Sequence, residues 1–337
     1  MRFIIYGAGG IGATIGARLH QAGVEVVLIA RGQHGQQLQR EGLKFVAPDG
    51  EFQLRIPSIT HPSELTWQDS DVVVLAMKSQ HTIAALTDLA AHAPEQVAVV
   101  CAQNGVANER MALRRRSRVY GMVVNLPALH LQPGEVVTHA SGTGGILDVG
   151  CYPGGCDDRA RKIASHISSA GFSCEARDSV MRWKYAKLLL NLGNALQAAV
   201  TPADMSVDTR SQEDAAVVAK ALRREGLTCF SLADIDCASR DEVVARHQDT
   251  YEMVQIPGYP RTGGSSWQSV RRGTGDIETD YLNGEICLLG GLHGTATPAN
   301  RVITRIARRM VTEQLPVGSF SAGEILALIE GEREQAQ

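Results

Sequence analysis

One segment near the N-terminus, Gly7-Ala-Gly-Gly-Ile-Gly12, constrains the fold of this chain more than any other. It fits the pattern G-x-G-x-x-G, follows the apolar run Arg2–Tyr6 and opens the amphipathic stretch Ile11–Ala22. In that context glycines permit a tight turn, close approach of the backbone to a pyrophosphate, and packing of the helix against the sheet. The start of the helix offers N–H groups and partial positive charge to the anion. The predicted cofactor contacts in this turn are Gly7, Ala8, Gly9, Gly10, Ile11 and Gly12.

The first half of the chain alternates strand-like and helical stretches. Predicted strands are Arg2–Tyr6, Val24–Ala30, Asp71–Met77 and Gln96–Cys101, and predicted helices are Ile11–Ala22 and Gln80–His92. Uninterrupted apolar runs are typical of strands covered on both faces, so we predict an α/β fold with an N-terminal, Rossmann-type, doubly wound parallel sheet. Pro48-Asp-Gly50 predicts a hairpin between Leu43–Ala47 and Phe52–Ile56. Further strands are predicted at Val119–Leu126, Glu135–Thr138, Gly145–Val149 and Gly171–Ala176.

From Asp178 onward the pattern becomes helical. Predicted helices are Val180–Ala199, Gln212–Ala233, Arg240–Met253, Glu278–Gly290 and Pro298–Gln314. We therefore divide the chain at Arg177, into a dinucleotide-binding domain (residues 1–177) and an all-α substrate and catalytic domain (residues 178–337).

Charge and composition exclude several classes of protein. With 33 Lys+Arg and 36 Asp+Glu the net charge is −3, which gives no general attraction to nucleic acid or to an anionic membrane. No apolar run is long enough to span a bilayer, and five glycines in Phe3–Ala17 favour a folded strand and turn over a leader peptide. The seven cysteines form no C-x-x-C pair, so we expect reduced thiols in a cytoplasmic protein without a metal site. Only Cys151 and Cys156 are candidates for a bridge in an oxidising setting.

The end of the second predicted strand bears on the choice of dinucleotide. An NAD site usually carries an acid there for the ribose 2′-hydroxyl, whereas this chain has Ala30-Arg31 and no carboxylate before Glu41. Arginine pairs with a 2′-phosphate, so we favour NADPH/NADP⁺. Arg31 also argues against a methyltransferase that binds S-adenosylmethionine; the alternative is an ordinary surface residue in a turn. Lys78 and Asn104 follow the next two predicted strands and are expected at the cofactor, although Asn104-Gly105 equally suits a plain turn.

A second group of candidates lies in the helical half. Lys187, Asn191 and Asn194 are spaced to share one polar stripe of a single, otherwise apolar helix. Buried, they need partners, which a small substrate bearing a carboxylate and a ketone would supply, and a partly desolvated lysine suits proton donation near neutral pH. The alternative is a lysine that extends to solvent beside structural amides. Gly263-Gly-Ser-Ser266 places Ser265 and Ser266 in a loop of donors suited to an anion. Glu278 opens a helix, where an acid also stabilises the helix dipole.

These residues together resemble the ketopantoate reductase family (2-dehydropantoate 2-reductase) over nearly the whole chain. The resemblance is carried by the glycine turn, Arg31, the Met-Lys-Ser-Gln loop at Lys78, Asn104-Gly105, Lys187-x-x-x-Asn191, and Ser266 followed by Ile277-Glu-Thr-Asp-Tyr-Leu-Asn-Gly284. It implies NADPH-dependent reduction of 2-dehydropantoate to pantoate, toward pantothenate and coenzyme A. It implies that Lys187 is the general acid, that Asn191 and Ser266 hold the substrate, and that Glu278 lies beside Lys187 and the cofactor.

Two departures from the family pattern fall on substrate contacts. The second asparagine of the family stands four residues after the first, where this chain has Ala195 and carries Asn194 instead, and glycines replace polar residues before Ser266. A related NADPH reductase of another 2-oxo acid therefore stays open, as does a non-catalytic NADP(H)-binding sensor that would have no use for Lys187. We expect a homodimer, although no sequence motif indicates the oligomeric state.

Overall fold

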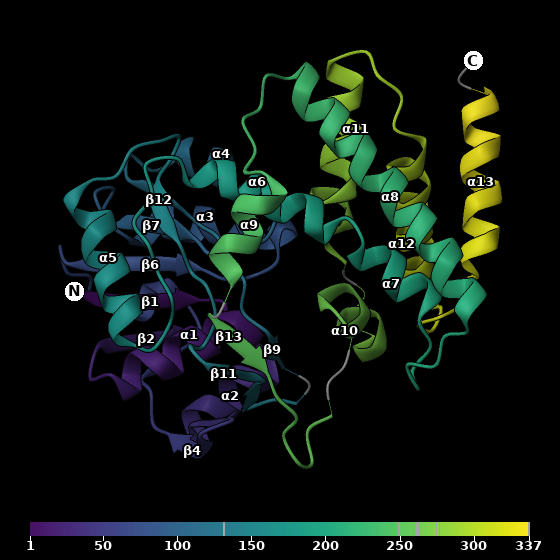
Figure 1. Cartoon of the computed structure of the whole chain (residues 1–337). Coiled ribbons are helices and arrows are strands. Elements are labelled where there is room, and N and C mark those ends of the chain that lie inside the picture. Colours follow the sequence, from purple (N-terminus) through teal and green to yellow (C-terminus); the bar gives the residue numbers. More distant parts are fainter. Residues whose placement is uncertain (131, 249, 261–262, 274, 276, 336–337) are drawn as a thin grey trace. The chain divides into compact units, whose positions relative to one another are not determined.

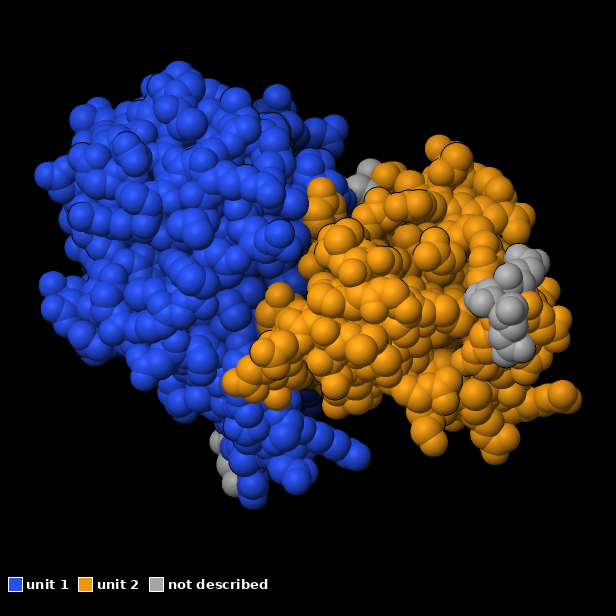
Figure 2. Space-filling model, turned by 90° about the horizontal axis from the view of Figure 1, so that it is seen from above, with its two compact units in different colours: residues 1–184, 238–261 blue, residues 185–237, 262–337 orange. Residues whose placement is uncertain are grey.

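The computed structural model describes residues 1–130, 132–248, 250–260, 263–273, 275 and 277–335. The chain forms two compact units (Figure 2): unit 1 comprises Met1–Lys184 and Ala238–Arg261, and unit 2 comprises Tyr185–Cys237 and Thr262–Gln337. The boundary expected from sequence, at Arg177, would assign the segment 238–261 to the helical part instead.

A seven-stranded sheet forms the centre of unit 1 (Figure 1), in the order β12-β8-β7-β6-β1-β2-β5. All neighbours pair in parallel except β12 and β8. The strands are β1 (Arg2–Tyr6), β2 (Glu25–Ile29), β5 (Ser58–Ile59), β6 (Asp71–Leu75), β7 (Ala98–Cys101), β8 (Val119–Met122) and β12 (Val149–Cys151). The predicted doubly wound parallel sheet is confirmed.

Side chains that alternate along these strands enter two separate cores. Phe3 and Ile5 of β1 face one core, together with residues of α1 (Gly10–Gln21) and α5 (Asp158–Ser169). Ile4 and Tyr6 face the other, with residues of α3 (Thr82–His92) and α4 (Asn108–Leu113). Coverage on both faces explains why β1 and β6 are apolar after their first residues, Arg2 and Asp71, which pair with each other.

A second sheet of unit 1 contains the predicted hairpin. Its order is β4-β3-β10-β9, formed by β3 (Leu43–Ala47), β4 (Gly50–Leu54), β9 (Ala128–Leu129) and β10 (Glu135–Thr138). Leu43 pairs with Leu54 across β3 and β4, and α2 (Gly32–Glu41) precedes this hairpin. The strands predicted at Gly145–Val149 and Gly171–Ala176 are wrong in extent: apart from Val149, which begins β12, they contribute only isolated bridges at residues such as Ile146 and Ser173.

The segment 238–261 differs most from expectation. The predicted helix Arg240–Met253 ends early, as α9 (Arg240–His247), and is followed by β13 (Tyr251–Met253), which pairs antiparallel with β11 (Ala140–Gly142). Arg246 makes two hydrogen bonds to the buried carboxylate of Asp148, at 3.0 and 2.6 Å. The ion pair with Asp148 and the strand pairing with β11 therefore place this segment in unit 1.

The described part of unit 2 is built from helices alone. They are the end of α6 (Val180–Asn191), α7 (Asn194–Val200), α8 (Thr209–Leu232), α10 (Ser265–Arg272), the 3₁₀ turn η3 (Glu278–Tyr281), α11 (Asn283–Leu292), α12 (Pro298–Thr312) and α13 (Ala322–Gln335). Gly226 of α8 lets that helix approach α6 closely, because an added Cβ would lie 2.6 Å from Leu189 Cδ2. The buried carboxylate of Glu225 accepts from the N–H groups of Ala299 and Asn300 and so caps α12 from a neighbouring helix. The predicted helical C-terminal domain is confirmed for unit 2, whereas the segment 238–261 contains the strand β13.

Candidate active site

The glycine turn between β1 and α1 has the geometry that its sequence predicts. Gly7 has φ +99°, and an added Cβ would lie 2.6 Å from the backbone nitrogen of Met77. An added Cβ at Gly12 would collide with the carbonyl oxygen of Gly7. At Gly9, by contrast, a Cβ would meet no described atom within 4 Å, and no described side chain caps α1. The turn is therefore tightly packed behind and open at Gly9, as a site for a pyrophosphate requires.

Two loops at the carboxyl edge of the sheet are joined by a buried polar network. Gln103 donates through Nε2 to the carbonyl of Met77 at 3.0 Å and to Thr82 Oγ1 at 2.7 Å. Asn108 donates through Nδ2 to Ser79 Oγ at 3.0 Å and accepts from Thr82 through Oδ1 at 2.7 Å. This network links the segment containing Lys78 to the segment containing Asn104, and Met77 lies against Gly7. The loops that carry Lys78 and Asn104 are thus joined to each other, and the first of them lies against the glycine turn through Met77.

Arg31 lies at the end of β2, next to the same turn. The N–H groups of Gly7 and Ala8 both donate to the carbonyl of Ile29, at 3.1 and 3.3 Å. Arg31 precedes α2 as its N-cap residue, and its side chain is exposed. A guanidinium in this place is available to an anionic group bound next to the glycine turn.

In unit 2, Lys187 and Asn191 lie one turn apart on α6, as predicted. Lys187 is half-buried, and burial lowers its pKa to about 8. Asn191 is 5% exposed, and its Nδ2 has no hydrogen-bond partner among the described residues. Buried amide donors in native proteins are nearly always satisfied, so an oxygen of a bound molecule is the expected partner.

Asn194 departs from the predicted stripe because α6 ends at Asn191 and a new helix, α7, begins at Asn194. Its side chain instead faces the Gly-Gly-Ser-Ser segment: a Cβ added to Gly264 would lie 3.6 Å from Asn194 Oδ1. The predicted loop also ends sooner than expected, because its last two residues are helical. Ser265 and Ser266 begin α10, which is held against α7 by fully buried Trp267, whose Nε1 donates to the carbonyl of Thr201 at 3.0 Å. The structure therefore brings Asn194 near Ser265 and Ser266.

Glu278 begins the turn η3, not an α-helix. Asn283, from the same Ile277–Gly284 motif, holds this motif against the end of α6. Asn283 Nδ2 donates to the carbonyl of Leu192 and to Asn300 Oδ1, both at 3.0 Å. Leu192 follows the last residue of α6, so the motif is attached to the helix that carries Lys187 and Asn191. The expected proximity of Glu278 to Lys187 stays a prediction.

Several residues of unit 1 that support the site were not predicted. Lys184, on α6, is buried beside Glu109, and His34 contacts the carbonyl of Ala8. A lysine inside an apolar helix was the only sequence signal for Lys184. Nothing local marked Glu109 or His34, because their contacts come from distant segments.

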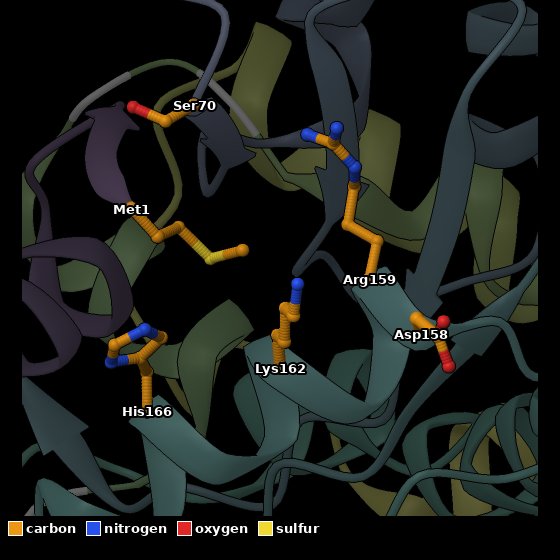
Figure 3. Close-up of a pocket in the computed structure, with 6 residues that line it drawn as sticks. All are labelled: Met1, Ser70, Asp158, Arg159, Lys162 and His166. Atoms are coloured by element: carbon orange, nitrogen blue, oxygen red, sulfur yellow. The ribbon is translucent and has the colours of Figure 1, made fainter.

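A pocket of about 450 Å³ (Figure 3) lies at the amino ends of β1 and β6, the edge of the sheet opposite the glycine turn. It is lined by Met1, Ser70, Asp158, Arg159, Lys162 and His166. Met1 and Ser70 precede β1 and β6, whereas the predicted cofactor residues follow the carboxyl ends of these strands. None of the predicted site residues is among those that line this pocket.

All seven cysteines are free, so the bridge left open for Cys151 and Cys156 is not formed. None of the helices built from the described residues has the length and apolar character needed to cross a lipid bilayer.

Family models match both halves of the chain. The model described as "Ketopantoate reductase PanE/ApbA" matches residues 3–154, and "Ketopantoate reductase PanE/ApbA C terminal" matches residues 179–311. A 2-dehydropantoate 2-reductase of Halobacterium salinarum is 27% identical over 312 residues, which cover 91% of this chain and 98% of that relative. One of Pyrococcus abyssi is 30% identical over 191 residues; the match covers 57% of this chain and 61% of the relative, less than two-thirds of its length.

Solved structures share the fold. A PanE/ApbA family ketopantoate reductase from Ralstonia eutropha superimposes with a TM-score of 0.76 at 27% identity, covering 93% of this chain and 99% of the other. D-mandelate dehydrogenase, solved with NADH and anilino(oxo)acetate, gives a TM-score of 0.78 at 23% identity, with coverage of 93% and 99%.

Proposed function

Because this chain belongs to the ketopantoate reductase family, we propose that it reduces 2-dehydropantoate to (R)-pantoate with NADPH, a step toward pantothenate and coenzyme A. The observation that carries the proposal is the pairing on α6 of a lysine whose pKa burial lowers to about 8 with a buried amide whose Nδ2 lacks a described partner. A proton donor beside an unsatisfied donor suits a substrate that presents a carbonyl and further oxygens.

The dinucleotide would be held by unit 1. Open space at Gly9 and the absence of a described side-chain cap on α1 fit a pyrophosphate there. Gly7, Ala8, Gly10, Ile11 and Gly12 complete this turn. When bound, NADPH supplies the hydride that reduces the carbonyl carbon.

Arg31 supports NADPH over NADH, because its exposed guanidinium follows β2, where an NAD site usually carries an acid. Lys78 and Asn104 are proposed as further cofactor contacts, from the two loops that the network of Gln103 and Asn108 joins.

The substrate would be held by unit 2. Asn191 would donate to a substrate oxygen, and Asn194, Ser265 and Ser266 would bind the carboxylate or hydroxyl from the start of α7 and α10. Lys187 would then protonate the carbonyl oxygen as it gains negative charge. Glu278 is proposed as a catalytic partner that touches Lys187 and the cofactor.

The test is direct. Protein mixed with NADPH and 2-dehydropantoate should lower the absorbance of NADPH, and Lys187→Ala should reduce the rate by about 10²- to 10⁴-fold, as expected for a lost general acid. A wild-type rate equal to that of buffer would exclude the proposal.

A related reductase of another 2-oxo acid is the second candidate. Ala195 occupies the position of the family's second asparagine, and glycines precede Ser265. The fold alone does not distinguish 2-dehydropantoate from another 2-oxo acid as the substrate, since D-mandelate dehydrogenase has the same fold. A panel of 2-oxo acids ranked by kcat/KM separates the two candidates, and a wide margin for 2-dehydropantoate would exclude the second. Tight NADPH binding without turnover of any member would instead favour the non-catalytic sensor. Cytoplasmic location and a homodimer stay predictions, testable by fractionation and light scattering.

A further inference from the structure

His34 lies between two backbone groups of unit 1 that are far apart in sequence. Its Nε2 is 2.6 Å from the carbonyl oxygen of Ala8, within the glycine turn. Its Nδ1 accepts from the N–H of Gly134 at 2.9 Å. The imidazole therefore connects the start of α2 to the turn before β10 and to the cofactor turn.

These two contacts fix the tautomer of the ring. A backbone N–H can only donate, so Nδ1 of His34 must be the acceptor and cannot carry a proton. The proton is then on Nε2, which donates to Ala8. The ring of His130 lies against that of His34, with ring centroids 4.3 Å apart, and His130 Nδ1 lies 3.0 Å from the carbonyl oxygen of Glu135. His34 thus has a defined orientation and a single donor.

The donor acts on the peptide that joins Ala8 to Gly9. In a trans peptide, the C=O of one residue and the N–H of the next lie in one plane and point in opposite directions. By holding the carbonyl of Ala8, His34 also sets the direction of the Gly9 N–H, which points away from the imidazole. Glycine lets this peptide rotate more freely than other residues would, so a fixed direction needs an external contact.

We propose that His34 is a positioning residue for cofactor binding, which orients the Gly9 N–H toward the dinucleotide phosphate by holding the Ala8 carbonyl. The proposal rests on the proposed function only in that the glycine turn binds NADP(H). It assigns a role to a side chain outside the motif that binds the phosphate.

Two substitutions separate the two contacts of the ring. Gln at position 34 keeps a donor near the place of Nε2, and Asn keeps a polar group near the place of Nδ1. We expect His34→Asn to weaken NADPH binding about tenfold, a loss typical of one hydrogen bond, while His34→Gln stays within about threefold of the wild type. His20→Asn, at the far end of α1, is the matched control. Dissociation constants would come from fluorescence titration, and urea unfolding would verify that all variants fold.

A second readout needs no cofactor. In protein labelled with ¹⁵N-glycine, the Gly9 amide signal is assigned by its loss in Gly9→Ala. His34→Asn should move this signal in the free protein, and His34→Gln should largely restore it. An unmoved Gly9 signal in His34→Asn would overturn the inference, as would equal losses of NADPH affinity in both variants. If the wild type binds no NADPH, the proposed function fails, and the Gly9 signal still decides whether His34 orients the turn.

Discussion

Lys184 Nζ lies 2.6 Å from Glu109 Oε1, and the two side chains are 2% and 0% exposed. The same ammonium donates to the carbonyls of Gln103 at 2.8 Å and of Cys101 and Met122 at 3.3 Å. Burial raises the pKa of Glu109, and the neighbouring charge of Lys184 opposes that shift. Lys184 therefore joins α6 to α4 through the ion pair, and to the carboxyl ends of β7 and β8 through the backbone carbonyls.

Removing one partner of this pair should be costly. We expect Lys184→Met to lower the free energy of unfolding by about 3 to 5 kcal/mol, because it leaves the carboxyl of Glu109 buried without its cation. Lys162→Met, at an exposed position of α5, should change it by less than about 0.5 kcal/mol. Urea unfolding followed by circular dichroism measures both. Equally small effects would show that the buried pair adds little.

The reaction should lose its acid as Lys187 deprotonates. Since burial lowers the pKa of Lys187 to about 8, the ammonium predominates below that pH and the neutral amine above it. We expect kcat/KM for 2-dehydropantoate to be level below pH 8 and to fall about tenfold per pH unit above it. Lys187→Ala should be slower and should lack this inflection. A wild-type profile that stays level to pH 10 would contradict the assigned role.

Alanine at Gly9 should weaken NADPH binding, whereas alanine at Gly12 should lower the stability of the fold. A Cβ at Gly9 meets no described atom within 4 Å, and Gly9 has φ −75°, so Gly9→Ala should fold normally yet raise the Kd for NADPH at least tenfold by obstructing the phosphate. At Gly12 the new Cβ would collide with the carbonyl of Gly7, so Gly12→Ala should lower stability by about 1 to 3 kcal/mol. Thermal unfolding and NADPH titration of both variants test this. Unchanged NADPH affinity in Gly9→Ala would remove the turn from the site.

Cofactor preference should depend on Arg31. We expect Arg31→Ala to weaken NADPH by about 1 to 3 kcal/mol, the value of a lost charge-assisted contact, and to leave NADH nearly unchanged. Arg40→Ala, an exposed arginine in the last turn of the same helix α2, should affect neither. The two dissociation constants for each variant provide the measurement. Equal weakening of NADPH and NADH would mean that Arg31 does not contact a 2′-phosphate.

Local patterns in the sequence were enough to predict the sheet and the glycine turn. Continuous apolar runs such as Val72–Leu75 predict strands covered on both faces, and β6 is completely buried. Pro48-Asp-Gly50 predicts the hairpin of β3 and β4 because turn residues act over a few positions. In both cases the signal and the structure that it determines lie within one short segment.

Long-range contacts decided what the sequence did not reveal. Helical periodicity continues through Leu192 and Gly193, yet α6 ends before them, where Asn283 donates to the carbonyl of Leu192 from a motif that is distant in sequence. The short strand β13 exists through its pairing with β11. Asn194 was expected on the stripe of Lys187, and the break in the helix moves it toward Gly264.

The path of the chain between its two units has a practical consequence for anyone who wishes to dissect the protein. The chain leaves unit 1 after Lys184, returns at Ala238 and leaves again after Arg261. A fragment truncated at Lys184 would lack β13 and expose the edge of β11 to adventitious pairing. It would also deprive the Asp148 carboxylate of Arg246. An isolated unit 1 should therefore be engineered with a short linker that splices Lys184 to Ala238.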